Sequence, residues 1–181
     1  MATQIWEIDS SHSGVHFNVR HLVVAKVRGQ FTRWSGRVRV EDGDLAHASV
    51  EVVIDASSID TGVTDRDTHL RSADFLDVEK FPEITFKGKT VDKTGEVLSV
   101  AGELTIHGVT REAVLEVEYS GQAQDPWGNQ RIGFSARTAL DRKDFGLTWN
   151  QALEAGGVLV GDRIAIEIEV EAVKQSAEKA A

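Results

Sequence analysis

Alternation of apolar and polar residues is the feature that most constrains the fold of this chain. Successive side chains of a β-strand point to opposite faces, so a period of two predicts a strand with one buried face. Seven segments show this pattern, and residues 5–9 and 31–40 bring the expected number of strands to eight or nine. The seven segments are residues 14–20, 49–54, 83–87, 98–106, 112–119, 132–140 and 164–172.

The length and order of these segments narrow the all-β class further. One-sided alternation is typical of an antiparallel sheet with one face in water. Turn sequences separate the segments at 41–44, 107–108 and 125–129. Long strands with short connections favour an up-and-down barrel or a curled sandwich, and closing a barrel removes its exposed edges.

Two segments interrupt the alternation. Residues Asp60 to Asp77 predict a short helix or lid-like loop that begins near Thr64 or Asp65. In the second segment, 145–160, we expect one helical turn from Asn150 to Glu154. The 181 residues fit a single domain over 1–181, with a core at about 5–173 and a frayed tail from Gln175 to Ala181.

Composition excludes several classes of protein. The chain has no cysteine, which excludes a disulfide framework, a thiolate zinc site and a cysteine nucleophile. Its net charge of −9 disfavours binding to nucleic acid or to an anionic membrane surface. No apolar stretch is long enough for stable membrane insertion, and no signal peptide is evident, so we expect a cytoplasmic location.

His21 is the most informative of the six histidines. It shares the parity of Val15, Phe17 and Val19, so it should project inward. A buried imidazole needs a partner, either in a hydrogen-bond network of the core, which we favour, or on a ligand in a cavity. A metal site is disfavoured, because the chain has no thiolate and no carboxylate or second pair stands at ligand spacing with His12 and His16.

The charged stretch from Arg66 to Asp74 allows two interpretations. The simpler is a solvated loop with local ion pairs of small energy. In the other, Arg66 meets an anionic or carbonyl head group at a cavity mouth and Asp67 braces it. No nucleophile elbow or phosphate-binding loop is present, so we predict no catalytic residues, no cofactor and no metal.

Several motifs together resemble the YceI-like family, in order and from Trp6 to about Val173. They are Trp6-x-Ile8-Asp9-x-x-His12-Ser13, Phe17-x-Val19-x-His21-Leu22, Gly29-x-Phe31, Ser58-Ile59-Asp60-Thr61-Gly62, Arg66-Asp67-x-His69-Leu70, Asp74-Phe75, Phe81-Pro82-x-Ile84-Thr85-Phe86, Gly102-x-Leu104-Thr105-Ile106-x-Gly108-Val109-Thr110, Asp141-Arg142-x-Asp144-Phe145-Gly146-Leu147 and Trp149-Asn150.

The resemblance implies an eight-stranded antiparallel barrel similar to lipocalins, with a short helix or lid segment. It implies an apolar tube for a long amphiphile, such as a polyisoprenoid, an isoprenoid quinone or a fatty-acid derivative. Many relatives are periplasmic and carry a signal peptide. With the inward parity, it gives these candidate ligand-binding residues: Phe17, Val19, His21, Arg66, Asp67, Leu70, Phe75, Val100, Val117, Phe134, Arg142, Trp149 and Asn150.

Three functions stay open on these grounds. The first is binding, storage or transport of a long-chain lipid, which a cavity without a nucleophile–base pair favours. The second is an enzyme that modifies such a lipid through His21 or the Arg66–Asp67 stretch. The third is a scaffold for protein contacts only, and pairing of two copies into a homodimer is a further open alternative.

Overall fold

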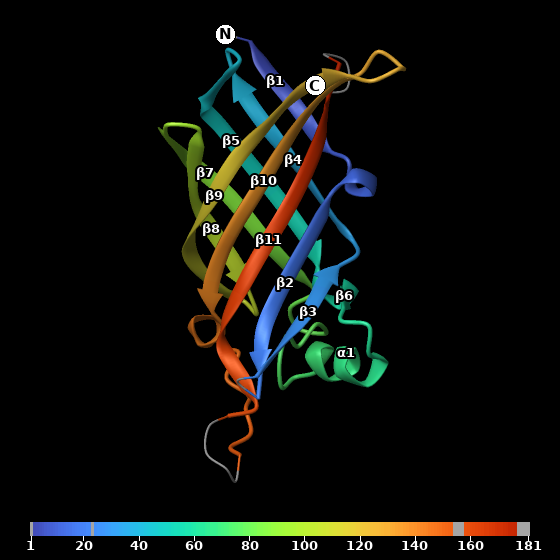
Figure 1. The fold of residues 1–181 in the computed structure, drawn as a ribbon, viewed down its shortest axis with the longest axis vertical. Helices are drawn as coiled ribbons and strands as arrows, with labels where there is room; N and C mark the ends of the chain where they lie inside the picture. The colour runs from blue at the N-terminus through green and yellow to red at the C-terminus, as the bar shows by residue number, and fades with distance from the viewer. Residues whose placement is uncertain (1, 23, 154–157, 177–181) are drawn as a thin grey trace.

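Eight antiparallel strands close into a barrel in the computed structural model, which describes residues 2–22, 24–153 and 158–176 (Figure 1). Hydrogen bonding runs in the order β1-β4-β5-β7-β8-β9-β10-β11, and β11 returns to β1. The eight-stranded antiparallel barrel expected from the sequence is therefore confirmed. The ring strands are β1 (Thr3–Ile8), β4 (Trp34–Glu41), β5 (Asp44–Asp55), β7 (Glu83–Thr94), β8 (Val97–Ile106), β9 (Val109–Gln124), β10 (Gln130–Asp141) and β11 (Val160–Lys174).

Three further strands extend the wall where β1 ends. β11 pairs with β1 over its last residues and with β2 (Gly14–His21) over its first ones. β2 then pairs with β3 (Ala25–Phe31), and β3 meets the two-residue β6 (Ile59–Asp60). The single strand predicted at 31–40 was wrong at its start, because β3 ends at Phe31 and β4 begins at Trp34.

The separate β3 strand was missed because its apolar alternation is weak. Its inward series is Ala25, Val27, Gly29 and Phe31, and only two of these are large. Packing favours glycine at position 29: with the Phe17 ring of β2 where it is, a Cβ atom there would lie 2.4 Å from its Cζ, and the ring would have to shift. The same glycine that leaves room for the Phe17 ring therefore interrupts the apolar series by which β3 would be recognised in the sequence.

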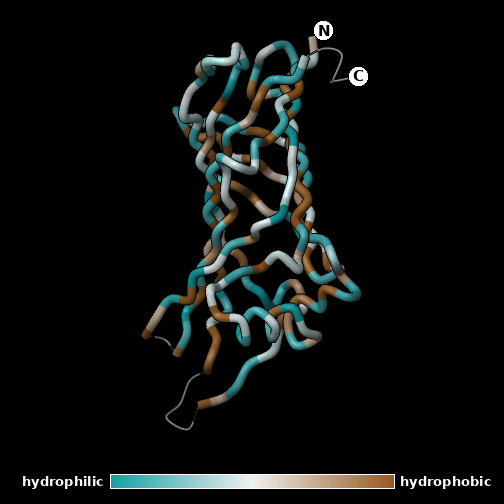
Figure 2. The backbone as a smooth tube through the Cα atoms, turned by 90° about the vertical axis from the view of Figure 1, so that its right-hand side faces the viewer, coloured by the Kyte–Doolittle hydropathy of each residue, from teal (hydrophilic) through white to brown (hydrophobic). Residues whose placement is uncertain are grey.

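The barrel has two different ends, named here by what they carry. The terminus end holds both chain termini and the β4–β5, β7–β8 and β9–β10 turns (Figures 1 and 2). The helix end holds the β2–β3 and β8–β9 turns, helix α1 (Thr64–Arg71) and the segment after β10. Two-residue turns with positive φ close one hairpin at each end, at Asp42-Gly43 and at His107-Gly108, as the turn sequences predicted.

The interruptions in the strand pattern lie at the helix end. The short helix predicted within 60–77 is α1, although Val63 is its N-cap residue and no side chain caps it. The helical turn expected from Asn150 was wrong: residues 150–153 are not helical, and Ala152 bridges Val158 instead. Residues 154–157 and the tail 177–181 lie outside the described residues, while Gln175 donates its N–H to the carbonyl of Ile5.

Candidate functional site

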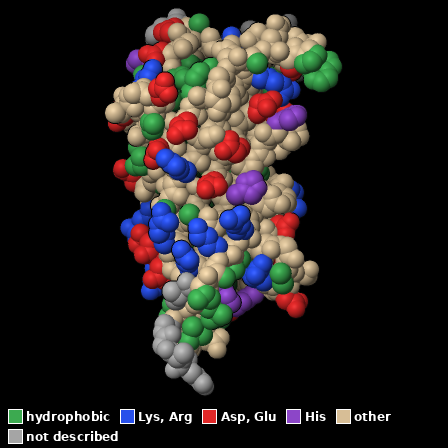
Figure 3. Space-filling model, viewed as in Figure 1, with side chains coloured by type: hydrophobic (Ala, Val, Ile, Leu, Met, Phe, Trp, Pro, Cys, Tyr) green, Lys and Arg blue, Asp and Glu red, His purple; other side chains and the backbone are tan. Residues whose placement is uncertain are grey.

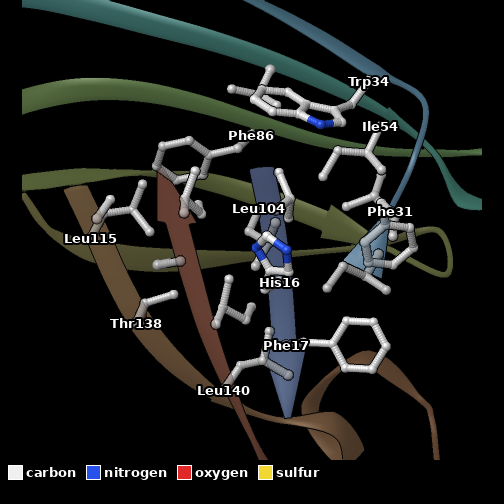
Figure 4. A pocket seen from close by; sticks show the side chains of 18 of the residues that line it. His16, Phe17, Phe31, Trp34, Ile54, Phe86, Leu104, Leu115, Thr138 and Leu140 are labelled. Atoms are coloured by element: carbon white, nitrogen blue, oxygen red, sulfur yellow. The ribbon is translucent and has the colours of Figure 1, made fainter. Parts of the chain in front are cut away.

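The inward side chains enclose an elongated cavity of about 270 Å³. It is lined by apolar residues of every ring strand and of β2 and β3, and Figure 4 shows Phe86, Leu104, Leu115 and Leu140 facing a common space. On β8 the lining runs from Leu98 to Ile106, about 26 Å of strand and about 20 Å along a tilted barrel axis. The cavity is therefore long enough for an extended chain.

Buried side chains fill the barrel at the terminus end. The inward series of four strands continue past their last cavity-lining residues into Trp6, Val40, Ile132 and Ala172, each at most 4 % exposed. The ammonium group of Lys174 lies 5.8 Å from the Trp6 ring centroid. Since β1 pairs with β4 and β11 here, the sheet itself and its side chains close this end.

The helix end is closed by segments outside the barrel strands. Leu70 of α1, with Phe75 and Leu76 behind it, lines the cavity, as does Leu147 from the segment after β10. Trp149 joins the two segments: its ring centroid lies 4.7 Å from that of His69 and 5.2 Å from that of Phe75. Asp74 accepts a hydrogen bond from His69 at 2.9 Å and fixes that ring.

Arg142 organises this end from within and is only 2 % exposed. Its guanidinium donates to the carbonyl oxygens of Leu147 at 2.7 Å, Trp149 at 2.8 Å and Gly161 at 2.9 Å. Burial lowers the pKa of Arg142, but arginine remains charged in proteins. The side chain borders the cavity, yet its donors hold backbone, so the expectation that it contacts a ligand applies only to its stem.

Asn150 holds the same segment to β11. Its side chain donates to the Val160 carbonyl at 2.7 Å and accepts from the Val160 N–H at 3.0 Å, the two bonds that a strand neighbour would make. Neither Asn150 nor Trp149 lines the cavity. The structure assigns both a role in closing the helix end, and their predicted contact with a ligand has no support in this geometry.

Arg66 and Asp67 do not meet each other at a cavity mouth. Arg66 donates to the hydroxyl of Thr61 at 2.7 Å and to its carbonyl at 2.9 Å. Asp67, 8 % exposed, accepts from the N–H and the hydroxyl of the same Thr61. Both side chains therefore fasten the chain before α1 through the same Thr61 hydroxyl, and the predicted contact of Arg66 with a head group has no support in this geometry.

His21 is half-buried at the end of β2 and lies outside the cavity lining. Its ring takes part in none of the hydrogen bonds among the described residues, so neither the core network nor the cavity contact is found. His16 borders the cavity, although the residue is exposed and its ring lies over Gly14. The parity of β2 holds as far as Val19, the last lining residue of that strand.

Of the thirteen candidate residues, eight line the cavity and five do not. The eight are Phe17, Val19, Leu70, Phe75, Val100, Val117, Phe134 and Arg142. The five outside the lining are His21, Arg66, Asp67, Trp149 and Asn150. Parity found the apolar members, whereas polar residues chosen from motifs serve to hold the chain in place.

A charged cluster on the terminus half was missed from the sequence. Arg131 donates to Asp9 at 3.0 Å, to Asp125 at 2.8 Å and to Glu171 at 2.7 Å. Chiefly through the Arg131 bond, the pKa of Asp125 falls to about 2. The pKa of Asp9 is also lowered, first by the hydroxyl of Ser11 and then by His12.

Asp9, His12 and Glu171 also approach one another closely enough to suggest a cation site. The expectation that no carboxylate accompanies His12 was wrong, because Asp9 Oδ2 lies 2.8 Å from its Nδ1. Arg131 already supplies positive charge to both carboxylates. The cluster is therefore a clamp between η1 (Ser10–His12), β10 and β11.

Comparison with known proteins agrees with this architecture. The family model described as YceI-like domain matches residues 6–172. A UPF0312 protein of Vibrio cholerae is 40% identical over 147 residues, which cover 81% of this chain and 78% of the relative.

Solved structures give the same result. The Campylobacter jejuni YCEI protein has a TM-score of 0.72 and 32% identity, and the match covers 87% of this chain and 90% of that one. A polyisoprenoid binding domain from Saccharophagus degradans has a TM-score of 0.67 over 94% of this chain and 98% of that one. At 16% identity, this second likeness concerns the fold alone.

Proposed function

The chain belongs to the YceI-like family, and we propose that it binds a long-chain amphiphilic lipid in the barrel for storage or transport. The observation that carries the proposal is the elongated apolar cavity of about 270 Å³. Burying apolar surface is favourable by roughly 0.8 kcal/mol for each CH₂ group, so the transfer of a long tail from water into the cavity is strongly favourable. The ligand classes are polyisoprenoids, isoprenoid quinones and fatty-acid derivatives.

Recognition of the tail rather than of a head group follows from the lining. Four of its members are polar, His16, Ser49, Thr138 and Arg142, and two of them have other partners: Arg142 donates to backbone carbonyls, and Thr138 donates its hydroxyl to the Val114 carbonyl at 2.9 Å. A polar head would lose hydration inside without gaining equivalent bonds, which costs free energy. The head group would therefore lie at an end of the cavity.

A polyisoprenoid is the ligand class we favour. The structural neighbour from Saccharophagus degradans is described as a polyisoprenoid binding domain, and it shares the fold. Branched chains also suit a wall of branched residues and aromatic rings such as Phe17, Phe86 and Phe134. Identification of the lipid recovered from the protein tests this preference over a straight fatty acyl chain.

Binding is favoured over catalysis by the same lining. Turnover of a lipid needs a nucleophile or an acid–base pair at the reacting atoms. Within the described part of the chain, the cavity lining is apolar apart from His16, Ser49, Thr138 and Arg142, and none of these four is hydrogen-bonded to another as a nucleophile and its base would be. The enzyme alternative predicts a chemically altered lipid after incubation, which mass spectrometry would detect.

The lipid would enter at the helix end, because that end is closed by parts that can move without breaking the barrel. α1 and the segment after β10 are held by the His69–Phe75–Trp149 rings and by side-chain bonds to backbone. Opening the terminus end would instead require separating β1 from β4 and β11.

Mass spectrometry of an organic extract of the purified protein tests the proposal. We expect a long-chain lipid in near-stoichiometric amount. Val117→Trp should prevent its retention, because the side chain lines the cavity, at a cost in stability of about 1–3 kcal/mol. Val114→Trp is the matched control, since Val114 is 49% exposed on the outer face of the same strand. Equal lipid content in both variants would contradict binding in this cavity.

A further inference from the structure

The outer face of the β2–β3 hairpin is positively charged in a chain whose net charge is −9. Arg20, Lys26 and Arg28 are exposed on it, and the other outward residues of the hairpin are not acidic. Arg20 lies directly opposite Lys26 in the register of the two strands. Like charges placed opposite each other destabilise a sheet, so this pairing needs another explanation.

The positive surface continues onto β11. Arg163 is exposed there, and Arg20 lies beside Gly161 of the same strand, where a Cβ atom would meet the Arg20 side chain at 3.3 Å. We name Arg20, Lys26, Arg28 and Arg163 the basic collar. Figure 3 shows Lys and Arg side chains gathered on this face of the helix-end half.

The collar is not neutralised by its surroundings. Among the described residues, none of its four cations has a carboxylate within ion-pair distance. Asp162 lies 3.2 Å from Lys143, and Asp141 accepts from the Lys143 N–H. Asp141 and Asp162 are thus engaged with other groups, although Asp141 stands opposite Arg163 in register, and the exposed Glu167 stands opposite His16.

Exposed apolar residues lie just beyond the collar at the helix end. Val24 is 81% exposed and Leu22 39% exposed at the turn between β2 and β3. The N–H of Leu22 donates to the carbonyl of Leu159 at 3.0 Å. This bond brings Val158, which precedes Leu159 and is 42% exposed, close to the same turn. We name Leu22, Val24 and Val158 the apolar tip.

We propose that the apolar tip and the basic collar form a docking surface for an anionic lipid bilayer. The collar would lie against the phosphate groups while the tip enters the boundary with the acyl chains, as membrane-surface elements do. Charge complementarity selects this partner. The acidic remainder of the protein would be repelled by the same surface, and this orients the helix end toward the membrane.

The inner face of the β2–β3 hairpin forms part of the cavity wall, which relates docking to lipid binding. Phe17 and Val19 line the cavity, on the side of the β2 strand opposite to Arg20. A lipid leaving the bilayer beside the tip would thus be next to the cavity wall. The docking itself does not rest on the proposed lipid binding, because vesicle association can be measured with a protein whose cavity is blocked.

Co-flotation with vesicles tests the surface. We expect the full chain to float with vesicles of phosphatidylcholine and phosphatidylglycerol at low salt, and less with pure phosphatidylcholine vesicles. Arg20→Gln with Lys26→Gln should weaken the association about 30-fold, since each cation near an anionic surface adds about fivefold. The control, Lys87→Gln with Lys93→Gln, removes the same charge from exposed β7 positions and should leave the association unchanged.

The tip is tested by Val24→Ser against Val114→Ser, two exposed valines exchanged in the same way. Only the first should reduce flotation, while Val117→Trp should float like the unchanged chain and so separate docking from lipid binding.

Equal losses in the two charge variants, or no flotation with anionic vesicles, would overturn the proposal. Binding to polyglutamate without vesicle binding would instead assign the collar to an acidic protein. Dimers in sedimentation that Val24→Ser abolishes, again without vesicle binding, would assign the tip to a second copy.

Discussion

The terminus end and the helix end close the same barrel by different means. At the terminus end, continuous β1–β4 and β1–β11 ladders surround buried Trp6 and Val40. At the helix end, α1 and residues 146–153 cross the opening outside the ring strands and are held by a buried arginine and three aromatic rings. Because the closure of the helix end lies outside the ladders of the ring strands, this difference supports the proposed entry of lipid at that end.

Charge separates the two ends in the same way. Arg131 forms ion pairs with the carboxylates of Asp9, Asp125 and Glu171 near the terminus end. The described cations of the hairpin at the helix end have no such partners, and apolar residues lie beyond them. The helix end has ion pairs of its own, such as Lys143 with Asp162, but the four described cations of the basic collar have none, and this contrast supports the proposed docking of that end. No described helix is long and apolar enough to cross a membrane.

The largest expected effect is at Arg142. Arg142→Ala should destabilise the protein by about 3–5 kcal/mol, because several buried carbonyls lose a charged donor. Arg131→Ala should cost less, since two of its three partners, Asp9 and Glu171, stay within reach of water and only the Asp125 side chain is nearly buried. Urea denaturation measures both. A larger loss for Arg131→Ala would invert the comparison of the two ends.

A smaller effect is expected at Trp149. Trp149→Ala should cost about 1–2 kcal/mol, because it removes ring contacts with His69 and Phe75. It should also speed lipid release, since these contacts hold α1 over the cavity. Trp127→Ala is the matched control at the terminus end, where the ring is 81% exposed. Release rates that match in the two variants would argue against entry beside α1.

The smallest effect concerns acid stability of the terminus end. The folded-state pKa of Asp125, about 2, lies below its usual value of 3.8, so its contribution is present above about pH 4. That contribution is lost as the pH falls toward 2. Arg131→Gln, which removes the principal cause of the shift, should flatten the change in urea midpoint between pH 4 and pH 2. A slope unchanged by the substitution would show that Arg131 does not set this dependence.

The wall of the barrel could be predicted from the sequence because it depends on local alternation. Strands over 98–106 and 132–140 follow from parity alone, and so does the inward direction of Val100 and Phe134. The strand that was missed depends instead on a residue of another strand. Gly29 is small for a reason that lies on β2, and β3 could not be recognised without that neighbour.

The polar residues could not be placed, because their partners are distant in the sequence. Arg131 meets Asp9 across 122 positions, and only the strand order brings them together. Arg142 has the appearance of a turn residue in DRKD, yet β11 and the segment after β10 supply carbonyls that bury it. Burial of a charged residue depends on such long-range partners, whereas an apolar residue is buried by its own chemistry.

Hydrogen exchange of the lipid-free and lipid-loaded protein tests the central claim, that lipid enters and leaves through the helix end. Without lipid, peptides covering 60–77 should exchange faster than those of β1 and β4. Loading with the lipid recovered by extraction should slow exchange at 60–77 and leave the terminus end almost unchanged. Protection confined to 146–153 would move the entrance to that segment. Protection at the terminus end without change at 60–77 would contradict the account.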